Sequence, residues 1–327
     1  LMTQYVEQSS KRTHFDDHFM YILNGWDYGQ AGTMNNKISG MPTIDGSILE
    51  ESKGTSGGYY VRWNGKGIVV NPGANFLKYF HEQELFIKDI DYVIVTRCEP
   101  EYYQDVKAIY NLNYEHNTLS KELHIIKYYL NEATFEALST QLKPRFKQER
   151  HSIQCLDLYQ DSPDVETVNL DDVITLDYFH TLPSSSQNGE ASKNIGICLR
   201  LKKGTSFDKA QEHDFLVIGY LSGVPWDASL APHLSNSDII IGAFEQTNPN
   251  DYNKVEFNKN SLGYHGTYNL IDQVNPQLFI FSEFKGQEGD IRLEVAKKLR
   301  QDFAYKKNHQ TVTLPGDCGM YIELKTL

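Results

Sequence analysis

The chain has 327 residues, of which 40% are hydrophobic and 12% aromatic, so it can bury one large core or two medium cores, and this composition excludes a disordered protein. Its net charge of −12 argues against nucleic acid as the main partner, because gripping phosphates needs clustered lysine and arginine. No apolar run reaches the ~20 residues of a membrane-spanning helix. The four cysteines form no CxxC pair and are typical of free thiols, so we expect a cytoplasmic globular protein without a membrane partner.

The first part of the chain predicts a polar segment, a strand and a long insertion. Residues 1–17 are polar, and we expect a single domain over residues 18–327. The run Phe19–Leu23 predicts its first strand. Residues 25–57 are rich in glycine, asparagine, serine and threonine, which indicates an inserted loop.

A β-hairpin is the clearest local prediction. Two β-rich runs, at 59–63 and 67–70, lie on either side of Asn64 and Gly65. Asn-Gly between such runs is the strongest short hairpin signal, because both residues accept the left-handed backbone that the tight turn needs.

Strands and helices alternate after the hairpin. Predicted strands cover 92–95, 123–127, 172–179, 195–201, 215–220, 238–242, 277–281, 310–314 and 320–324. Predicted helices cover 75–82, 104–112, 132–141, 267–274 and 290–303. Strands followed by mixed helices and strands, twice over, predict an α/β protein with two packed sheets and helices on both outer faces, a four-layer αββα sandwich.

One stretch joins a buried strand to a polar loop. In DYVIVTRCEPEYYQDV, residues 91–106, the apolar run YVIV leads directly into arginine, glutamate and tyrosine side chains. Loops at strand ends are where α/β proteins place their binding and catalytic groups.

This stretch and several others resemble the metallo-β-lactamase fold superfamily over roughly residues 55–325. The family's features occur in order: a turn after a hairpin, a strand leading into the ligand loop, a strand followed by a tight turn, a helix entry and a last strand. The corresponding segments are VVNPG at 69–73, DIDYVIVTRCEPEYYQD at 89–105, FLVIGYLSGVPWD at 215–227, NSLGYHGTYNLI at 260–271 and PQLFIFSEFKG at 276–286. The resemblance implies the αββα fold and a metal-dependent hydrolytic site.

The first ligand motif of that family is not preserved here. By position, Arg97 and Glu99 replace two histidines, Glu101 replaces an aspartate, and Tyr102 replaces the last histidine. Arg97 cannot bind a cation, because a guanidinium has only donors and stays protonated. Its charge would also oppose Zn²⁺.

The later ligand positions are altered as well. Gly223 stands where the resemblance places a bridging aspartate, Ser261 where it places a histidine, and Glu283 where it places the last ligand. His180 is the nearby histidine that could match the middle ligand. A dinuclear centre needs two metals ~3.5–4 Å apart and most of their ligands. We therefore expect neither a metal nor another cofactor.

Two hypotheses about function follow. In the first, the protein is a catalytically inactive, hydrolase-like pseudoenzyme in which Arg97 pairs with a carboxylate and closes the former cavity. It would act as a binding or regulatory subunit, through a protein partner or a small-molecule ligand in the remnant cleft, since the resemblance implies such roles in bacterial assemblies. In the second, it is a divergent metal-dependent hydrolase of a phosphoester or cyclic nucleotide with an oxygen-rich site. The candidate ligands of that site are Glu99, Glu101, Asp105, His180 and Glu283.

A local basic cluster is the last feature. Lys143, Arg145, Lys147 and Arg150 lie within eight residues of an otherwise acidic chain. The simplest interpretation is a solvated helix face.

Overall fold

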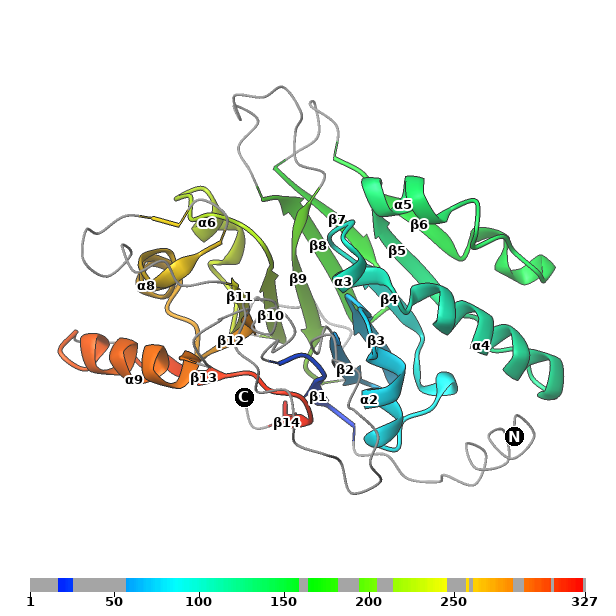
Figure 1. The fold of residues 1–327 in the computed structure, drawn as a ribbon, viewed down its shortest axis with the longest axis horizontal. Helices are drawn as coiled ribbons and strands as arrows, with labels where there is room; N and C mark the ends of the chain where they lie inside the picture. The colour runs from blue at the N-terminus through cyan, green and yellow to red at the C-terminus, as the bar shows by residue number, and fades with distance from the viewer. Residues whose placement is uncertain are drawn as a thin grey trace, which may run out of the picture.

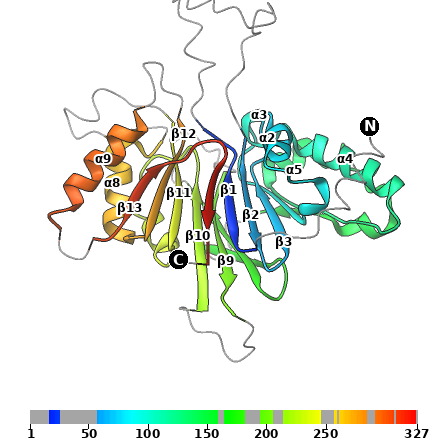
Figure 2. The ribbon, with the colours of Figure 1, turned by 90° about the horizontal axis from the view of Figure 1, so that it is seen from below.

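The computed structural model describes residues 17–25, 57–158, 164–181, 194–204, 214–245, 257–258, 261–284, 291–306 and 309–325. Within these residues, two seven-stranded sheets pack face to face, and helices cover the outer face of each (Figures 1 and 2). The four layers are clearest in Figure 2, where α8 and α9 lie on one side and α2, α4 and α5 on the other. The predicted αββα sandwich is confirmed.

The first sheet has the order β14-β1-β2-β3-β4-β5-β6. Its pairs are antiparallel from β14 to β3 and parallel from β3 to β6. The strands are β1 (Phe19–Ile22), β2 (Tyr59–Trp63), β3 (Lys66–Val70), β4 (Tyr92–Val95), β5 (Lys127–Asn131), β6 (Ile153–Leu156) and β14 (Met320–Glu323).

The second sheet has the order β13-β12-β11-β10-β9-β8-β7. Its pairs are parallel from β13 to β10 and antiparallel from β10 to β7. The strands are β7 (Val165–Asn169), β8 (Ile174–His180), β9 (Ile195–Lys202), β10 (Phe215–Leu221), β11 (Ile239–Glu245), β12 (Leu278–Phe284) and β13 (Val312–Pro315). Each sheet thus joins an antiparallel half to a parallel half.

The helices divide between the two outer layers. The first sheet carries α2 (Phe76–Glu82), α3 (Pro100–Tyr103), α4 (Val106–Leu119), α5 (Glu132–Leu138) and the 3-10 helices η2 (Ile87–Asp89) and η3 (Lys147–His151). The second sheet carries α6 (Leu230–Leu234), α8 (Gly263–Val274) and α9 (Arg292–Phe303). None of the helices in the described ranges is long and apolar enough to cross a membrane.

Three apolar clusters correspond to the three interfaces between the four layers. The cluster between the sheets includes Ile22, Ile94, Ile218 and Ile280. A second joins α6, α8 and α9 to their sheet, and a third joins α2 and α4 to the other sheet. Strands in both sheets are apolar on two faces, because each sheet is covered on both sides.

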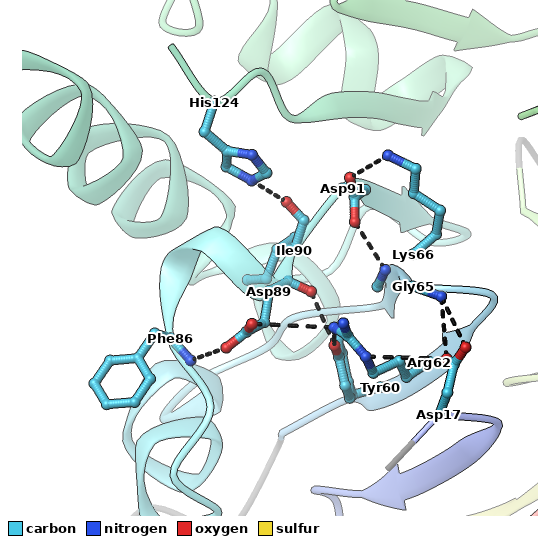
Figure 3. A network of polar contacts seen from close by, with 11 residues as sticks. Asp17, Tyr60, Arg62, Gly65, Lys66, Phe86, Asp89, Ile90, Asp91 and His124 are labelled. Atoms are coloured by element: carbon cyan, nitrogen blue, oxygen red, sulfur yellow. Dashed lines mark hydrogen bonds and ion pairs between the residues drawn. The ribbon is translucent and has the colours of Figure 1, made fainter. Parts of the chain in front are cut away.

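The predicted hairpin is confirmed, and its turn is anchored by aspartates. Asn64 and Gly65 have φ values of 49° and 73°, the left-handed backbone expected of this turn. The carboxylate of Asp17 accepts the Gly65 N–H at 3.0 and 3.1 Å. Asp91 accepts the N–H of Gly67 at 2.9 Å and pairs with the ammonium group of Lys66 at 2.9 Å (Figure 3).

The two aspartates of the DID sequence therefore hold the fold rather than a ligand. Asp89 is 4% exposed, and its carboxylate accepts the Phe86 N–H at 2.8 Å. Its backbone carbonyl accepts the hydroxyl of Tyr60 at 2.9 Å, and its carboxylate lies 4.0 Å from Arg62 (Figure 3). Both aspartates tie the entry of β4 to the hairpin, which fixes where β4 delivers the loop that follows it.

Several predicted boundaries were wrong. The strand predicted at 123–127 lies at Lys127–Asn131, where four consecutive residues are buried between the helices and the other sheet. The helix predicted at 104–112 begins at Val106 and continues to Leu119. Strands β6 and β7 and helix α6 were missed, because each is only four or five residues long. Most of the polar segment at 1–17 and of the inserted loop at 25–57 lies outside the described residues.

Candidate functional site

The candidate site lies where strands of both sheets end. Asn71 follows β3, Arg97 lies just after β4, Ser222 follows β10, and Glu283 is the next-to-last residue of β12. Polar groups at the carboxyl ends of parallel strands form the usual ligand crevice of α/β proteins. Because the two sheets pack face to face, Asn71 Nδ2 of one sheet donates to the hydroxyl of Tyr220 in the other at 2.9 Å.

Arg97 is at the centre of this crevice. Its Nε and Nη2 donate to the two carboxylate oxygens of Glu99 at 3.0 and 2.9 Å, a bidentate pair. Its Nη1 donates to the hydroxyls of Tyr102 at 3.2 Å and Ser222 at 3.3 Å. The Arg97 side chain is 13% exposed, whereas that of Glu99 is 41% exposed. In this pair Glu99 therefore lies on the solvent side and Arg97 on the inner side.

Gly223 leaves the space that the guanidinium of Arg97 occupies, because glycine has no side chain. Its φ of +57° is left-handed, and a Cβ placed on it would lie 1.6 Å from Nη1 of Arg97. Real carbon atoms never come so close. A side chain at position 223 and the present guanidinium therefore exclude one another, so the arginine and the glycine form one structural unit.

Glu283 is the inner carboxylate of the crevice, and it is saturated with hydroxyl donors. It is 5% exposed and has a left-handed φ of 52°. Its Oε2 accepts Ser222 Oγ at 2.5 Å and the Tyr102 hydroxyl at 3.0 Å. Its Oε1 accepts the hydroxyls of Tyr220 and Tyr59, the latter at 3.3 Å. The hydroxyls of Ser222 and Tyr102 thus bridge the guanidinium of Arg97 to this carboxylate.

The surroundings keep these hydroxyls protonated. Burial, and then the negative charge of Glu283, raise the pKa of Tyr59 and of Tyr220 well above the usual value. Protonated phenols can donate to the carboxylate at any physiological pH. Asn71 orders the opposite side, because its Nδ2 also donates to Thr96 Oγ1 at 2.8 Å and its Oδ1 accepts the Thr96 N–H at 2.8 Å.

The structure brings some of the predicted site residues together, but not all of them. Arg97, Glu99, Tyr102, Gly223 and Glu283 lie together, as the contacts above establish. Of the remaining four predicted residues, Glu101 is half-buried on α3, Asp105 is half-buried before α4, His180 is exposed at the end of β8, and Ser261 is buried before α8.

Asp105 has a structural contact of its own. Its carboxylate accepts the Leu77 N–H at 3.0 Å and so links the start of α4 to α2. Burial raises its pKa, and the backbone hydrogen bonds oppose that rise. No described contact connects Asp105, His180 or Ser261 to the network around Glu283.

Four residues of the crevice were missed by the sequence analysis. They are Tyr59, Asn71, Tyr220 and Ser222. Two of them had a signal, since Asn71 opens the NPG turn and Ser222 precedes Gly223. The tyrosines had none, because a strand tyrosine is usually a packing residue.

The donor set of the crevice does not fit a zinc ion. Zinc binds through histidine nitrogen, thiolate and carboxylate groups. Among the residues that the structure describes, no group of three or more histidine, cysteine, aspartate or glutamate side chains is arranged to hold a metal. In the crevice, one carboxylate is taken by a guanidinium and the other by four hydroxyls.

Comparison with known proteins identifies the fold. No protein-family model and no curated protein sequence matches the chain. Among solved structures, it is similar to the metallo-β-lactamase fold protein YhfI from Bacillus subtilis, with a TM-score of 0.58 over 94% of this chain and 99% of that chain. The chain has the metallo-β-lactamase fold. The two sequences are 11% identical, so the likeness concerns the fold alone.

Other structures with the metallo-β-lactamase fold align equally completely. A diphosphatase from the PhnP family has a TM-score of 0.58 at 11% identity, over 93% of this chain and 97% of its own. Zn²⁺-bound PqqB from Methylobacterium extorquens has a TM-score of 0.55 at 11% identity, over 93% and 99%. The neighbours in structure thus include hydrolases, and the architecture extends over almost the whole chain.

Proposed function

We propose that this protein is a catalytically inactive member of the metallo-β-lactamase fold, a pseudoenzyme that acts as a binding or regulatory subunit. It would work through contacts with a protein partner or through a small ligand in the remnant crevice. One observation carries the proposal: the guanidinium of Arg97 lies 1.6 Å from where a Cβ at position 223 would be. The position that the resemblance gives to a bridging aspartate is therefore filled by a cation.

The charge balance of the crevice supports the same proposal. Two carboxylates, Glu99 and Glu283, meet one guanidinium, directly or through the hydroxyls of Tyr102 and Ser222. A buried carboxylate must be paired or hydrogen-bonded, and here Arg97 and the hydroxyls meet that need. A divalent ion would have to displace these donors and lie beside a positive charge that cannot be deprotonated.

The competing hypothesis, a metal-dependent hydrolase of a phosphoester or cyclic nucleotide, is favoured by the structural neighbours, one of which is a diphosphatase. It requires its candidate ligands to converge on one ion. In the described contacts the carboxylate of Glu99 pairs with the guanidinium of Arg97, and that of Asp105 accepts the Leu77 N–H. His180 is exposed at the end of a strand. The hydrolase hypothesis therefore needs a rearrangement of several side chains at once.

Metal content decides between the two hypotheses. The purified protein is incubated with Zn²⁺ or Mn²⁺, dialysed and analysed by inductively coupled plasma mass spectrometry, and its melting temperature is measured with and without chelator. We expect far less than one metal ion per chain and an unchanged melting temperature, because a bound ion would add to stability. Stoichiometric metal, together with a melting temperature that falls in chelator, would overturn the proposal.

A matched variant sharpens this test. Glu283→Gln keeps the shape of the side chain and removes its charge. Under the proposal it leaves metal content and hydrolysis of bis(p-nitrophenyl) phosphate at the background level of the unaltered protein. If the unaltered protein hydrolyses this substrate with added metal and the variant does not, the hydrolase hypothesis is correct.

A further inference from the structure

The basic cluster found in the sequence is not a helix face. Residues 143–151 form a loop and the 3-10 helix η3, which Figure 1 shows beside α4 at the outer edge of the molecule. Their single acid, Glu149, is 6% exposed, and its carboxylate accepts the N–H groups of Arg145 at 2.8 Å and Phe146 at 3.1 Å. The carboxylate of Glu149 is therefore occupied by backbone N–H groups of its own segment. The exposed cations of the segment do not pair with it.

Arg145 is held in place with its guanidinium exposed. The guanidinium carbon lies 4.2 Å from the centre of the Tyr114 ring and 5.2 Å from that of Tyr110. Its Nη2 donates to Oδ1 of Asn111 at 2.9 Å. A planar guanidinium that is already oriented loses less conformational entropy when it binds a carboxylate.

The other cations of the segment carry no counter-charge. Lys143, Lys147 and Arg150 are exposed, and within the described part of the chain they form no ion pair, nor does Arg145. Some lysines elsewhere do have acidic partners: the half-buried Lys66 pairs with Asp91 at 2.9 Å and Lys306 with Asp272 at 2.7 Å, and the exposed Lys298 pairs with Asp302 at 2.5 Å. Lys107, exposed on α4 one turn before Asn111, extends the positive surface along that helix.

We propose that this surface docks an acidic segment of a partner protein. The surface consists of Lys107, Lys143, Arg145, Lys147 and Arg150, and is called the basic surface below. Aspartate and glutamate carboxylates match the guanidinium forks and the ammonium groups in charge and geometry. None of these five side chains contacts the network around Glu283, so the inference does not depend on whether the crevice is inactive.

The charge of the rest of the molecule favours a short acidic segment over a nucleic acid. The chain carries −12 with these five cations included, so the rest of the chain is more negative still. A nucleic-acid strand bears a phosphate about every 3.4 Å. Phosphates that extend beyond the basic surface would be repelled by the negative net charge of the rest of the protein. A short acidic segment of a protein can end within the basic surface.

The test measures binding of a fluorescein-labelled octaglutamate peptide to the full chain by fluorescence anisotropy. We expect saturable binding that weakens as salt rises, because the contacts are exposed to solvent. The variant Lys143→Glu/Lys147→Glu/Arg150→Glu should bind the peptide about tenfold more weakly or worse, since three contacts become repulsive.

The matched control is Lys203→Glu/Lys297→Glu/Lys325→Glu, which changes the net charge equally at exposed lysines elsewhere. It should weaken binding far less than the first variant. Melting curves check the fold of both, and the neutral variant Lys143→Gln/Lys147→Gln/Arg150→Gln replaces the first if that one unfolds. Absence of binding to the unaltered protein, or equal weakening by the control, would overturn the proposal. Tighter binding of a single-stranded DNA of equal charge, or of phosphatidylserine vesicles, would also overturn it.

Discussion

Arg97 and Arg145 make the same local contact in opposite surroundings. Each guanidinium lies over a tyrosine ring, at 4.6 Å from Tyr102 and 4.2 Å from Tyr114. Arg97 is nearly buried and is bound by the carboxylate of Glu99, whereas Arg145 is exposed, forms no ion pair within the described part of the chain and donates to the amide oxygen of Asn111. The two residues show how burial decides what a cation does in this protein.

The difference follows from solvation. A buried charge must be paired, because the interior does not replace the water that it loses. The polar side chains around Glu283 and Arg97 therefore satisfy one another. An exposed cation is already solvated and can remain without a counter-charge, so the cations of the basic surface need no partner within the protein.

The largest effect is expected from Arg97→Ala. This change removes the positive charge nearest the buried Glu283 carboxylate and the partner of the half-exposed Glu99, and we expect it to lower the free energy of unfolding by about 3 kcal/mol, since a buried charge left without a nearby opposite charge is uncompensated. Urea unfolding followed by tryptophan fluorescence measures the loss. A loss below about 1 kcal/mol, the range of exposed pairs, would mean that the crevice is as well solvated as the basic surface.

A somewhat smaller effect is expected from Gly223→Ala. The new Cβ must displace the guanidinium of Arg97 and adopt a left-handed backbone, which together should lower the free energy of unfolding by about 2 kcal/mol. In the Arg97→Ala background only the backbone term of about 1 kcal/mol should remain, so the two changes are not additive. Strict additivity in the same urea experiment would contradict the view that residues 97 and 223 form one unit.

The contrast between buried and exposed groups also predicts how the stability of the protein depends on pH. His116 on α4 is 6% exposed, and burial lowers its pKa below the usual 6.5, whereas His151 of the basic segment is exposed. The unfolded chain therefore takes up a proton at a higher pH than the folded protein does. Stability is fully present above about pH 6.5 and is lost as pH falls through the folded pKa.

The measurement is the free energy of unfolding in urea between neutral and mildly acidic pH. His116→Gln should flatten this profile, because it removes the buried imidazole whose pKa is lowered. An unchanged slope in His116→Gln would assign the acid sensitivity to another group, and His233, whose pKa burial also lowers, would be the next to replace.

The smallest effect is expected from Arg145→Ala. Its loss removes the contacts of an exposed guanidinium with two tyrosine rings and its hydrogen bond to Asn111, which should lower the free energy of unfolding by less than about 1 kcal/mol. The same variant should still weaken binding of the octaglutamate peptide. A large loss of stability would show that Arg145 is a structural residue and not a docking residue.

Much of the fold could be predicted because its signals are local. Asn64-Gly65 marks a turn by backbone preference alone, and the apolar runs of β4 and β9 to β12 are long enough to be recognised. The short strands β6 and β7 could not be found, since four or five residues carry too little pattern. The position of β5 was wrong because its residues are buried on both faces, which removes the alternation that marks a strand.

The site could be predicted only in part, for a related reason. The resemblance brought residues 97, 99, 102, 223 and 283 to one crevice, and the structure places them together. The resemblance also pointed to His180 and Ser261, and the hydrolase hypothesis added Asp105, but none of these three has a described contact with that network. Tyr59 and Tyr220 escaped notice because only the packing of two sheets turns these strand residues toward Glu283.

The sequence by itself determined most of the longer strands and helices, the hairpin and the presence of an arginine where a metal ligand would be expected, because each depends on residue type and near neighbours. Only the tertiary structure decided that Arg97 fills the space beside Gly223, that hydroxyls from both sheets surround Glu283, and that Glu149 turns inward while the cations around it face solvent. Those outcomes depend on distances between residues far apart in the chain, and burial then determines which charges must find a partner within the protein.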